Sequence, residues 1–181
     1  MYVSRTKDEE HHEDCLRPRF SKKNFIMIWG GIHDLTGRKL LVIWEKDNWD
    51  FITAQAYLDH ILEPVVYPFF QQFQWTGIIF MDDNAPAHRA KIVNEFKEQH
   101  FMTSLNWPSN SPDLNPIENL WNVLKTRLQA RNPRPRTLPD VKQAVIEEWD
   151  SITADEIDKY VDSMPEHIQA VVDNHEGHTR W

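Results

Sequence analysis

A short apolar run without polar interruption, Gly77 to Met81 (GIIFM), ends in two consecutive aspartates, Asp82 and Asp83. Such a run is typical of a strand that is covered on both faces in the centre of an α/β sheet. Ligands of these sheets gather at the carboxyl ends of strands, where the two aspartates lie. Neighbouring strand residues point to opposite faces, so only one aspartate can face a given site. Acids after a strand are also common turn residues, and this feature alone leaves both interpretations open.

The flanking sequence predicts further strands and helices of a mixed sheet covered by helices. The apolar runs Asn24–Ile32 and Lys39–Trp44 predict a hairpin, and Phe101–Leu105 predicts another strand. Capping residues and helical spacing predict helices over residues 53–73 with breaks at Pro64 and Pro68, over residues 87–99, from Asn115, from Thr137 or Asp140 through Trp149, and over residues 153–172.

The length of 181 residues predicts one domain. We divide it into a polar N-terminal segment (residues 1–23), an α/β core (24–136) and acidic C-terminal helices of the same domain (137–181). The single cysteine, Cys15, excludes a disulfide scaffold and a Cys-rich zinc site. No apolar run is long enough to span a membrane, and the polar, acidic start of the chain does not resemble a signal peptide.

The net charge of −8 is unevenly distributed. Residues 1–136 hold 17 acids and 17 bases, whereas residues 137–181 hold 11 acids and 3 bases, so the excess lies in the C-terminal quarter. Just before it, residues 122–136 contain no acid, and we expect this stretch to contact nucleic acid. Its basic residues are Lys125, Arg127, Arg131, Arg134 and Arg136. Ordinary solvated surface is the alternative interpretation of the same residues.

Glu118 lies one turn inside the helix that begins at Asn115 and Pro116. On spacing alone, its side chain is expected to reach back to the Asn115 amide in a capping box. The alternative is that the helix places this carboxylate near Asp83. Converging carboxylates repel one another unless cations neutralise them, and Mg²⁺ or Mn²⁺ with oxygen ligands would do so. Two such ions serve phosphoryl transfer by binding the attacking and the leaving oxygens.

Two segments resemble a known family. Phe80–Ala90 (FMDDNAPAHRA) and Trp107–Lys125 (WPSNSPDLNPIENLWNVLK) closely resemble the second and third catalytic blocks of mariner-like DDE transposases of the Tc/mariner superfamily. The 34 residues between Asp83 and Glu118 match the spacing of one large branch of that superfamily. The stretch Ile28–Gly31 and the C-terminal residues Gly177–Trp181 are also similar to family segments.

The resemblance implies an α/β, ribonuclease-H-like fold in which a mixed sheet is flanked by helices. It implies that Asp83 and Glu118 are catalytic acids and ligands of two Mg²⁺ or Mn²⁺ ions, with Asn84 and His88 in support. Asp82 falls where the family usually has a non-catalytic residue. A purely structural hydrogen bond is the alternative role for His88. The implied reaction is cleavage and transfer of DNA strands at transposon ends, with transposon ends and target DNA as partners.

The family's first catalytic acid lies on the first strand of the sheet, and no segment of residues 1–24 resembles that strand. The paired helix-turn-helix modules of the family are absent as well. We therefore expect a catalytic domain without its first strand and inactive as written. A non-enzymatic, transposon-derived relic that binds nucleic acid is the alternative; a two-carboxylate hydrolase of small substrates is disfavoured, because no phosphate-binding loop or activated nucleophile accompanies the acids. A homodimer is possible, no membrane partner is expected, and a eukaryotic host would imply a nuclear location.

Overall fold

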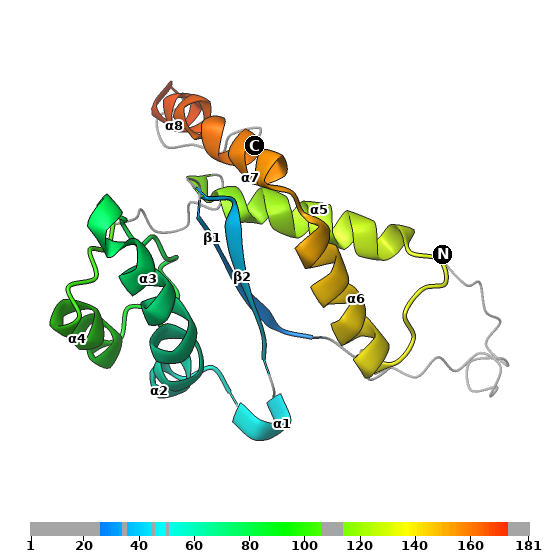
Figure 1. Ribbon diagram of the computed structural model, residues 1–181, viewed down its shortest axis with the longest axis horizontal. Coiled ribbons are helices and arrows are strands. Elements are labelled where there is room, and N and C mark those ends of the chain that lie inside the picture. The colour runs from blue at the N-terminus through cyan, green and yellow to red at the C-terminus, as the bar shows by residue number, and fades with distance from the viewer. Residues whose placement is uncertain (1–25, 34–35, 45, 50, 106–113, 174–181) are drawn as a thin grey trace, which may run out of the picture.

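A two-stranded antiparallel hairpin lies in the middle of the molecule (Figure 1). The computed structural model describes residues 26–33, 36–44, 46–49, 51–105 and 114–173. Strand β1 (Ile28–His33) pairs with strand β2 (Arg38–Ile43) in a register that sets Trp29 opposite Val42. The predicted hairpin is therefore confirmed. The predicted N-terminal segment, residues 1–23, and most of the loop from Trp107 lie outside the described residues.

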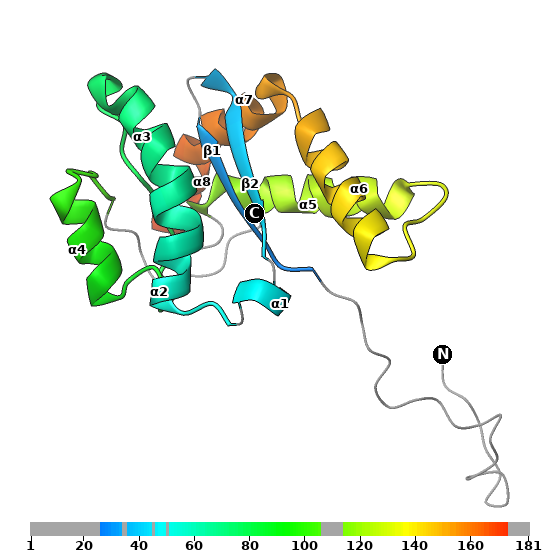
Figure 2. The same ribbon diagram turned by 60° about the horizontal axis from the view of Figure 1, so that its bottom comes forward.

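Helices cover the hairpin on two sides. Those before residue 100 lie on one side and α5 to α7 lie on the other, as Figure 1 and Figure 2 both show. The helical elements are α1 (Lys46–Trp49), α2 (Ala54–Tyr57), the π-helical segment η4 (Leu58–Val66), α3 (Tyr67–Phe73), the 3₁₀ turn η5 (Gln74–Thr76), α4 (Lys91–Gln99), α5 (Pro116–Ala130), α6 (Leu138–Ser151), α7 (Ala154–Asp162) and α8 (Met164–Asp173). No helix in this described part of the chain is long and apolar enough to cross a membrane.

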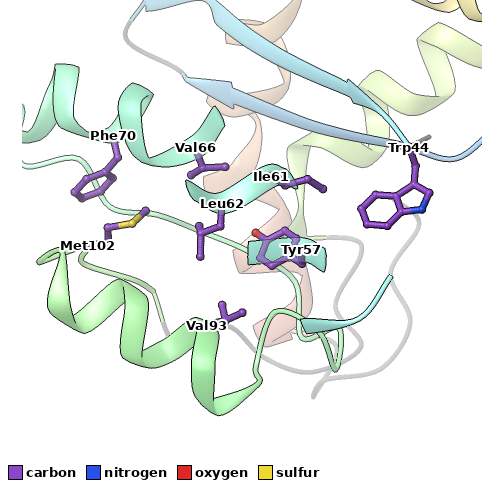
Figure 3. Close-up of a cluster of buried hydrophobic side chains, with 8 residues drawn as sticks. All are labelled: Trp44, Tyr57, Ile61, Leu62, Val66, Phe70, Val93 and Met102. Atoms are coloured by element: carbon purple, nitrogen blue, oxygen red, sulfur yellow. The ribbon is translucent and has the colours of Figure 1, made fainter. Parts of the chain in front are cut away.

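Each face of the hairpin is packed against its own apolar cluster, because side chains alternate along a strand. Trp29 and Val42 contact the first cluster, which holds Tyr57, Ile61 and other side chains drawn in Figure 3. In that view Val93 points from α4 toward the helix that carries Tyr57. The second cluster packs against the opposite face of the hairpin, and its buried members are Leu120, Leu124, Val145, Trp149, Ile152 and Ile157. A hairpin covered on both faces fits the α/β fold class predicted from the sequence.

Gly30 sets how closely α5 approaches β1. A Cβ atom added at Gly30 would lie 2.4 Å from Cη2 of Trp121, so only glycine admits this ring. The Trp121 ring in turn stacks on Trp149 of α6, with centroids 4.8 Å apart. Both tryptophans lie on the apolar sides of their helices, since Trp149 is buried and Trp121 packs in the same cluster.

Polar contacts attach the hairpin to the C-terminal helices. The Lys39 ammonium group donates to the carbonyl oxygen of Asp150 at 2.7 Å and also to that of Ile152. These carbonyl groups end α6, where a cation is favourable. Burial is the main cause that lowers the pKa of Lys39 below its ordinary value, and Asp150 opposes the shift. In the hairpin turn, Gly37 has φ of +58° and lies against Ala154 at the start of α7.

The predicted helix starts at Thr53, Asn115 and Thr137 are confirmed. The Thr53 hydroxyl accepts from the Ala56 amide at 3.1 Å, and Thr137 forms a capping box with Asp140. The predicted breaks at Pro64 and Pro68 are wrong, because the chain stays helical from residue 54 through residue 73. The wider turns of η4 accommodate Pro64, which lacks the amide that an α-helix interior requires.

Two other sequence expectations need correction. Between residues 77 and 81 the chain forms no regular strand; Phe80 makes a single parallel bridge to Ser104, the one paired residue of the predicted strand Phe101–Leu105. Ile79 is 55% exposed, because no described strand pairs with this segment on its other side. The helix predicted from residue 87 begins at Lys91, since residues 86–89 form turns after Asp83.

We predict that Gly30→Ala lowers the free energy of unfolding by about 1–3 kcal/mol, because the new methyl group overlaps the Trp121 ring. Urea denaturation followed by circular dichroism measures this loss. Trp121→Phe shortens the ring, so the double variant should lose less than the sum of the two single variants. Strict additivity, or an unchanged stability of Gly30→Ala, would contradict the proposed contact.

Candidate functional site: two carboxylates on one cavity

Asp83 and Glu118 border the same cavity, although 34 residues separate them in the chain. The cavity has a volume of about 730 Å³ and lies between β1, residues 76–83 and the start of α5. Asp83 follows the bridged residue Phe80, and Glu118 lies in the first turn of α5. The structure therefore places both predicted acids on the lining of one cavity.

Asp83 is held by two hydrogen bonds to one carboxylate oxygen. His88 Nδ1 donates to Asp83 Oδ1 at 2.6 Å, and the Ala85 amide donates to the same oxygen at 3.0 Å. The hydrogen bond from His88 is the main reason that the pKa of the Asp83 carboxyl lies below its ordinary value; partial burial opposes it. The Asp83 side chain remains 61% exposed, so its ionised carboxylate is accessible to a cation.

A buried tyrosine lies behind His88. The Tyr57 ring packs on the His88 ring with centroids 4.2 Å apart, which fixes the imidazole against Asp83. Burial raises the pKa of the Tyr57 hydroxyl, and the charges of Asp82 and Asp83 raise it further. Asn84, the other predicted supporting residue, follows Asp83 directly and is half-buried.

Asp82 is neutralised by a lysine that the sequence analysis did not single out. Lys97 Nζ donates to Asp82 Oδ2 at 2.5 Å, and both side chains are largely buried. The Lys97 ammonium group also lies 5.1 Å from the centre of the Phe80 ring. Lys97 follows Val93 by four residues on the buried face of α4. A lysine at a position where the helical spacing predicts an apolar residue is the sequence signal that would have indicated a buried ion pair.

Glu118 does not form the capping box that spacing alone favours. Asn115 caps α5 by accepting from the Ile117 amide at 3.3 Å, and Pro116 occupies the first helical position. Within the described residues, no hydrogen bond joins the Glu118 carboxylate to the Asn115 amide, and the side chain is exposed. Glu118 therefore remains available at the edge of the cavity.

The two carboxylates are chemically suitable ligands for a divalent metal ion, but two ligands are too few to form a metal site. Oxygen donors of this type are the ligands that Mg²⁺ and Mn²⁺ prefer. Over the residues that the structure describes, however, no group of three or more His, Cys, Asp and Glu side chains is placed to hold a metal ion. A further oxygen ligand from outside these residues would be needed to complete such a site.

Two of the five predicted nucleic-acid-binding residues make ion pairs with the acidic helices. Arg127 pairs with Glu156 at 2.5 Å, and Arg131 pairs with Glu147 at 2.5 Å and with Glu148 at 2.9 Å. The remaining three are exposed, and the described residues give them no ion pair: Lys125, Arg134 and Arg136. The basic stretch and the acidic C-terminal quarter thus neutralise each other in part.

Comparisons with known proteins support one family. The sequence profile described as DDE superfamily endonuclease matches residues 7–142. The Tc1 transposase of Caenorhabditis elegans is 36% identical over 152 residues, which cover 82% of this chain and 51% of that protein. The Tcb2 transposase of Caenorhabditis briggsae is 32% identical over 153 residues, covering 82% of this chain and 51% of that protein. The chain spans about half the length of the curated relatives it matches.

Solved structures agree in fold. The catalytic domain of Mos1 transposase with raltegravir and Mn superposes with a TM-score of 0.66 at 20% identity, covering 78% of this chain and 71% of that chain. A Mos1 paired-end complex with the left transposon end gives a TM-score of 0.64 at 20% identity, covering 77% of this chain and 40% of that chain. These similarities confirm the ribonuclease-H-like fold class inferred from the sequence.

We predict that the ion pair between Asp82 and Lys97 stabilises the segment that carries Asp83. Lys97→Met leaves the Asp82 carboxylate buried without a partner and should lower the free energy of unfolding by about 3 kcal/mol. The double variant Asp82→Asn with Lys97→Met removes both charges and should recover most of that loss. Urea denaturation measures both variants.

Lys91→Met provides a matched control on the same helix. The Lys91 side chain is 87% exposed, and its pair with Glu95 should contribute less than about 1 kcal/mol. Equal losses for Lys91→Met and Lys97→Met, or no recovery in the double variant, would show that the Asp82–Lys97 pair does not stabilise the segment.

Proposed function

The chain belongs to the DDE superfamily endonuclease family, and we propose on that premise that it is the catalytic part of a Tc/mariner-type transposase, which cleaves and joins DNA strands with divalent metal ions. The convergence of Asp83 and Glu118 on one cavity carries the proposal. When bound there, Mg²⁺ or Mn²⁺ would activate an attacking oxygen and stabilise the leaving oxygen. The solved Mos1 catalytic domains with Mn and with Mg support this choice of metal.

The residues of the candidate site have distinct roles in this proposal. Asp83 and Glu118 hold the metal, and His88 orients Asp83 by its hydrogen bond. Asp82 stays outside the metal site, because Lys97 neutralises it. A third acidic ligand comes from polypeptide outside the described residues, and without it residues 26–173 bind metal weakly and turn over little DNA.

DNA is the proposed partner, with the exposed basic residues of and after α5 contacting phosphates. Two copies assembled on paired transposon ends are the proposed arrangement of the whole protein, in line with the paired-end complex of Mos1 transposase. In a eukaryotic host such a protein would act in the nucleus. The alternative, a non-enzymatic DNA-binding relic, rests on the same basic residues and on the lack, among the described residues, of a group of three side chains placed to hold a metal ion.

We predict that the 181-residue chain binds Mn²⁺ weakly and that Asp83→Asn and Glu118→Gln each reduce the affinity at least tenfold, because each removes one of two charged ligands. Isothermal titration calorimetry measures the affinity. Glu63→Gln is the control, since this exposed acid in η4 does not border the cavity. Unchanged Mn²⁺ affinity in the double variant, Asp83→Asn with Glu118→Gln, would contradict the proposed metal site.

The same samples test turnover. Supercoiled plasmid incubated with the chain and Mn²⁺ should be nicked no faster than with Asp83→Asn. Rapid nicking that disappears in Asp83→Asn would overturn the proposed inactivity and would show that the chain is itself an active endonuclease. If the chain binds DNA but its metal affinity does not depend on Asp83 or Glu118, the alternative function, a non-enzymatic DNA-binding relic, is favoured.

For DNA binding, we predict that replacing Lys125, Arg134 and Arg136 together by alanine flattens the salt dependence of affinity. The slope of log K against log salt should fall by about 0.9 for each phosphate contact removed. Arg127→Ala with Arg131→Ala should leave the slope nearly unchanged, because these side chains are paired with acids. Fluorescence anisotropy of a labelled duplex at several salt concentrations measures both; equal slopes for the two variants would contradict the assignment.

A further inference from the structure

The Asp83 carboxylate uses one of its two oxygens in hydrogen bonds to the described residues. His88 Nδ1 and the Ala85 amide both donate to Oδ1, at 2.6 Å and 3.0 Å. Two donors on one oxygen fix the direction of the carboxylate and leave Oδ2 without a hydrogen bond from these residues. The direction in which Asp83 presents Oδ2 therefore depends on where the His88 imidazole is held.

His88 has few polar restraints of its own. It lies in the turns of residues 86–89, where its amide donates to the Ala85 carbonyl at 2.9 Å. Within the described part of the chain, the bond to Asp83 is the one hydrogen bond of its side chain. A single hydrogen bond to an exposed carboxylate does not immobilise a side chain, because water competes for it and rotamer entropy opposes it. The imidazole needs a second contact to keep this orientation.

The Tyr57 ring supplies the second contact. Its centroid lies 4.2 Å from that of the His88 ring, and the two planes are inclined by 39°. Tyr57 is the last residue of α2, is fully buried, and packs in the first apolar cluster with Ile61 and Val93 (Figure 3). A rigid ring enclosed by the core thus lies against a side chain of a surface turn.

The hydroxyl group of Tyr57 does not explain this contact. It is buried and has no hydrogen-bond partner in the described structure. Burial raises the pKa of the hydroxyl, and the charges of Asp82 and Asp83 raise it further, so the side chain stays neutral. An enclosed, neutral phenol is neither a general base nor an anionic metal ligand. What Tyr57 offers the site is the flat face of its ring.

We propose that Tyr57 is a positioning residue of the candidate site, whose ring holds His88 against Asp83 and so keeps Asp83 Oδ2 directed toward a divalent cation. Tyr57 acts on His88, His88 acts on Asp83, and of the three only Asp83 contacts the cation. The role of the cation rests on the proposed function, whereas the contact between Tyr57 and His88 exists without metal. The orientation of a surface ligand is thereby tied to the packing of the core.

Packing of the core alone is the competing explanation for Tyr57, and a second tyrosine–histidine pair provides the matched control. Tyr67 of α3 and His100, which follows α4, also have ring centroids 4.2 Å apart. Neither residue borders the cavity of Asp83 and Glu118. Loss of the Tyr67 ring therefore removes a comparable ring contact without affecting the candidate site.

The first measurement uses the metal-free chain with 15N-labelled histidine. The His88 Nδ1 proton should give a resolved NMR signal, because Nδ1 donates to Asp83. Tyr57→Met keeps an apolar side chain in the core but removes the flat ring, so this signal should be lost through exchange with water. Tyr57→Phe should restore the signal, since the hydroxyl is not needed, and Tyr67→Met should leave the signal unchanged.

The second measurement is Mn²⁺ affinity by calorimetry. His88→Ala and Tyr57→Met should each weaken binding about tenfold, because both release the orientation of a ligand. The double variant should bind no more weakly than His88→Ala alone, since Tyr57 acts through His88. Tyr57→Phe and Tyr67→Met should bind Mn²⁺ like the unchanged chain.

Circular dichroism first establishes which variants are folded. A retained His88 Nδ1 signal in folded Tyr57→Met, or additive losses of affinity in the double variant, would overturn the proposal and assign Tyr57 to the core alone. If Tyr57→Met does not fold, the unchanged chain decides: nuclear Overhauser contacts between the Tyr57 and His88 rings and the Nδ1 signal are expected, and their absence overturns the proposal.

A failure of the proposed function gives a different result. Unchanged Mn²⁺ affinity in Asp83→Asn with Glu118→Gln would contradict the metal site itself. The metal-free NMR signal of His88 would still decide whether Tyr57 holds His88 against Asp83.

Discussion

The contact between Gly30 and Trp121 determines where the candidate site forms. Because Gly30 has no side chain, the Trp121 ring lies directly on β1 and stacks on Trp149 behind it. Trp121 is three residues beyond Glu118, so the contact fixes the first turn of α5 against the hairpin. The Asn115 cap and Pro116 begin that turn at the cavity. The position of one of the two carboxylates thus follows from apolar packing, with no charge involved.

Charge pairing determines what the other acid can do. Two adjacent aspartates at one opening would repel each other if both were ionised and unpaired. Lys97 neutralises Asp82 in a largely buried pair, whereas His88 and the Ala85 amide hold Asp83 in its ionised form at the surface. The same pairing occurs at the far end of α5, where Arg127 and Arg131 bind acids of α6 and α7. Part of the excess negative charge of the C-terminal helices is therefore neutralised by ion pairs within the domain.

Local signals in the sequence predicted the hairpin and the helix caps, because each depends on residues close in the chain. The family and its fold class followed from two motif blocks. Two features depended on distant contacts and could not be predicted this way: the ion pairs of the basic stretch and the single bridge at Phe80. Helical continuity through Pro64 depends on the wider turns of η4, which the usual effect of proline on an α-helix does not predict. The run from Gly77 to Met81 has the composition of a central strand, but a central strand requires neighbours on both edges, and the described residues supply a single bridge on one edge.

The account depends most directly on whether Asp83 and Glu118 bind one cation at the cavity that both residues border. Paramagnetic broadening of backbone amide signals during a Mn²⁺ titration measures this in the isotopically labelled chain. The account predicts that the amides of residues 82–84 and of residues 117–119 broaden together, at the same metal concentration, and that Asp83→Asn abolishes both effects. Broadening of only one of these segments, or of both at clearly different Mn²⁺ concentrations, would contradict a shared site.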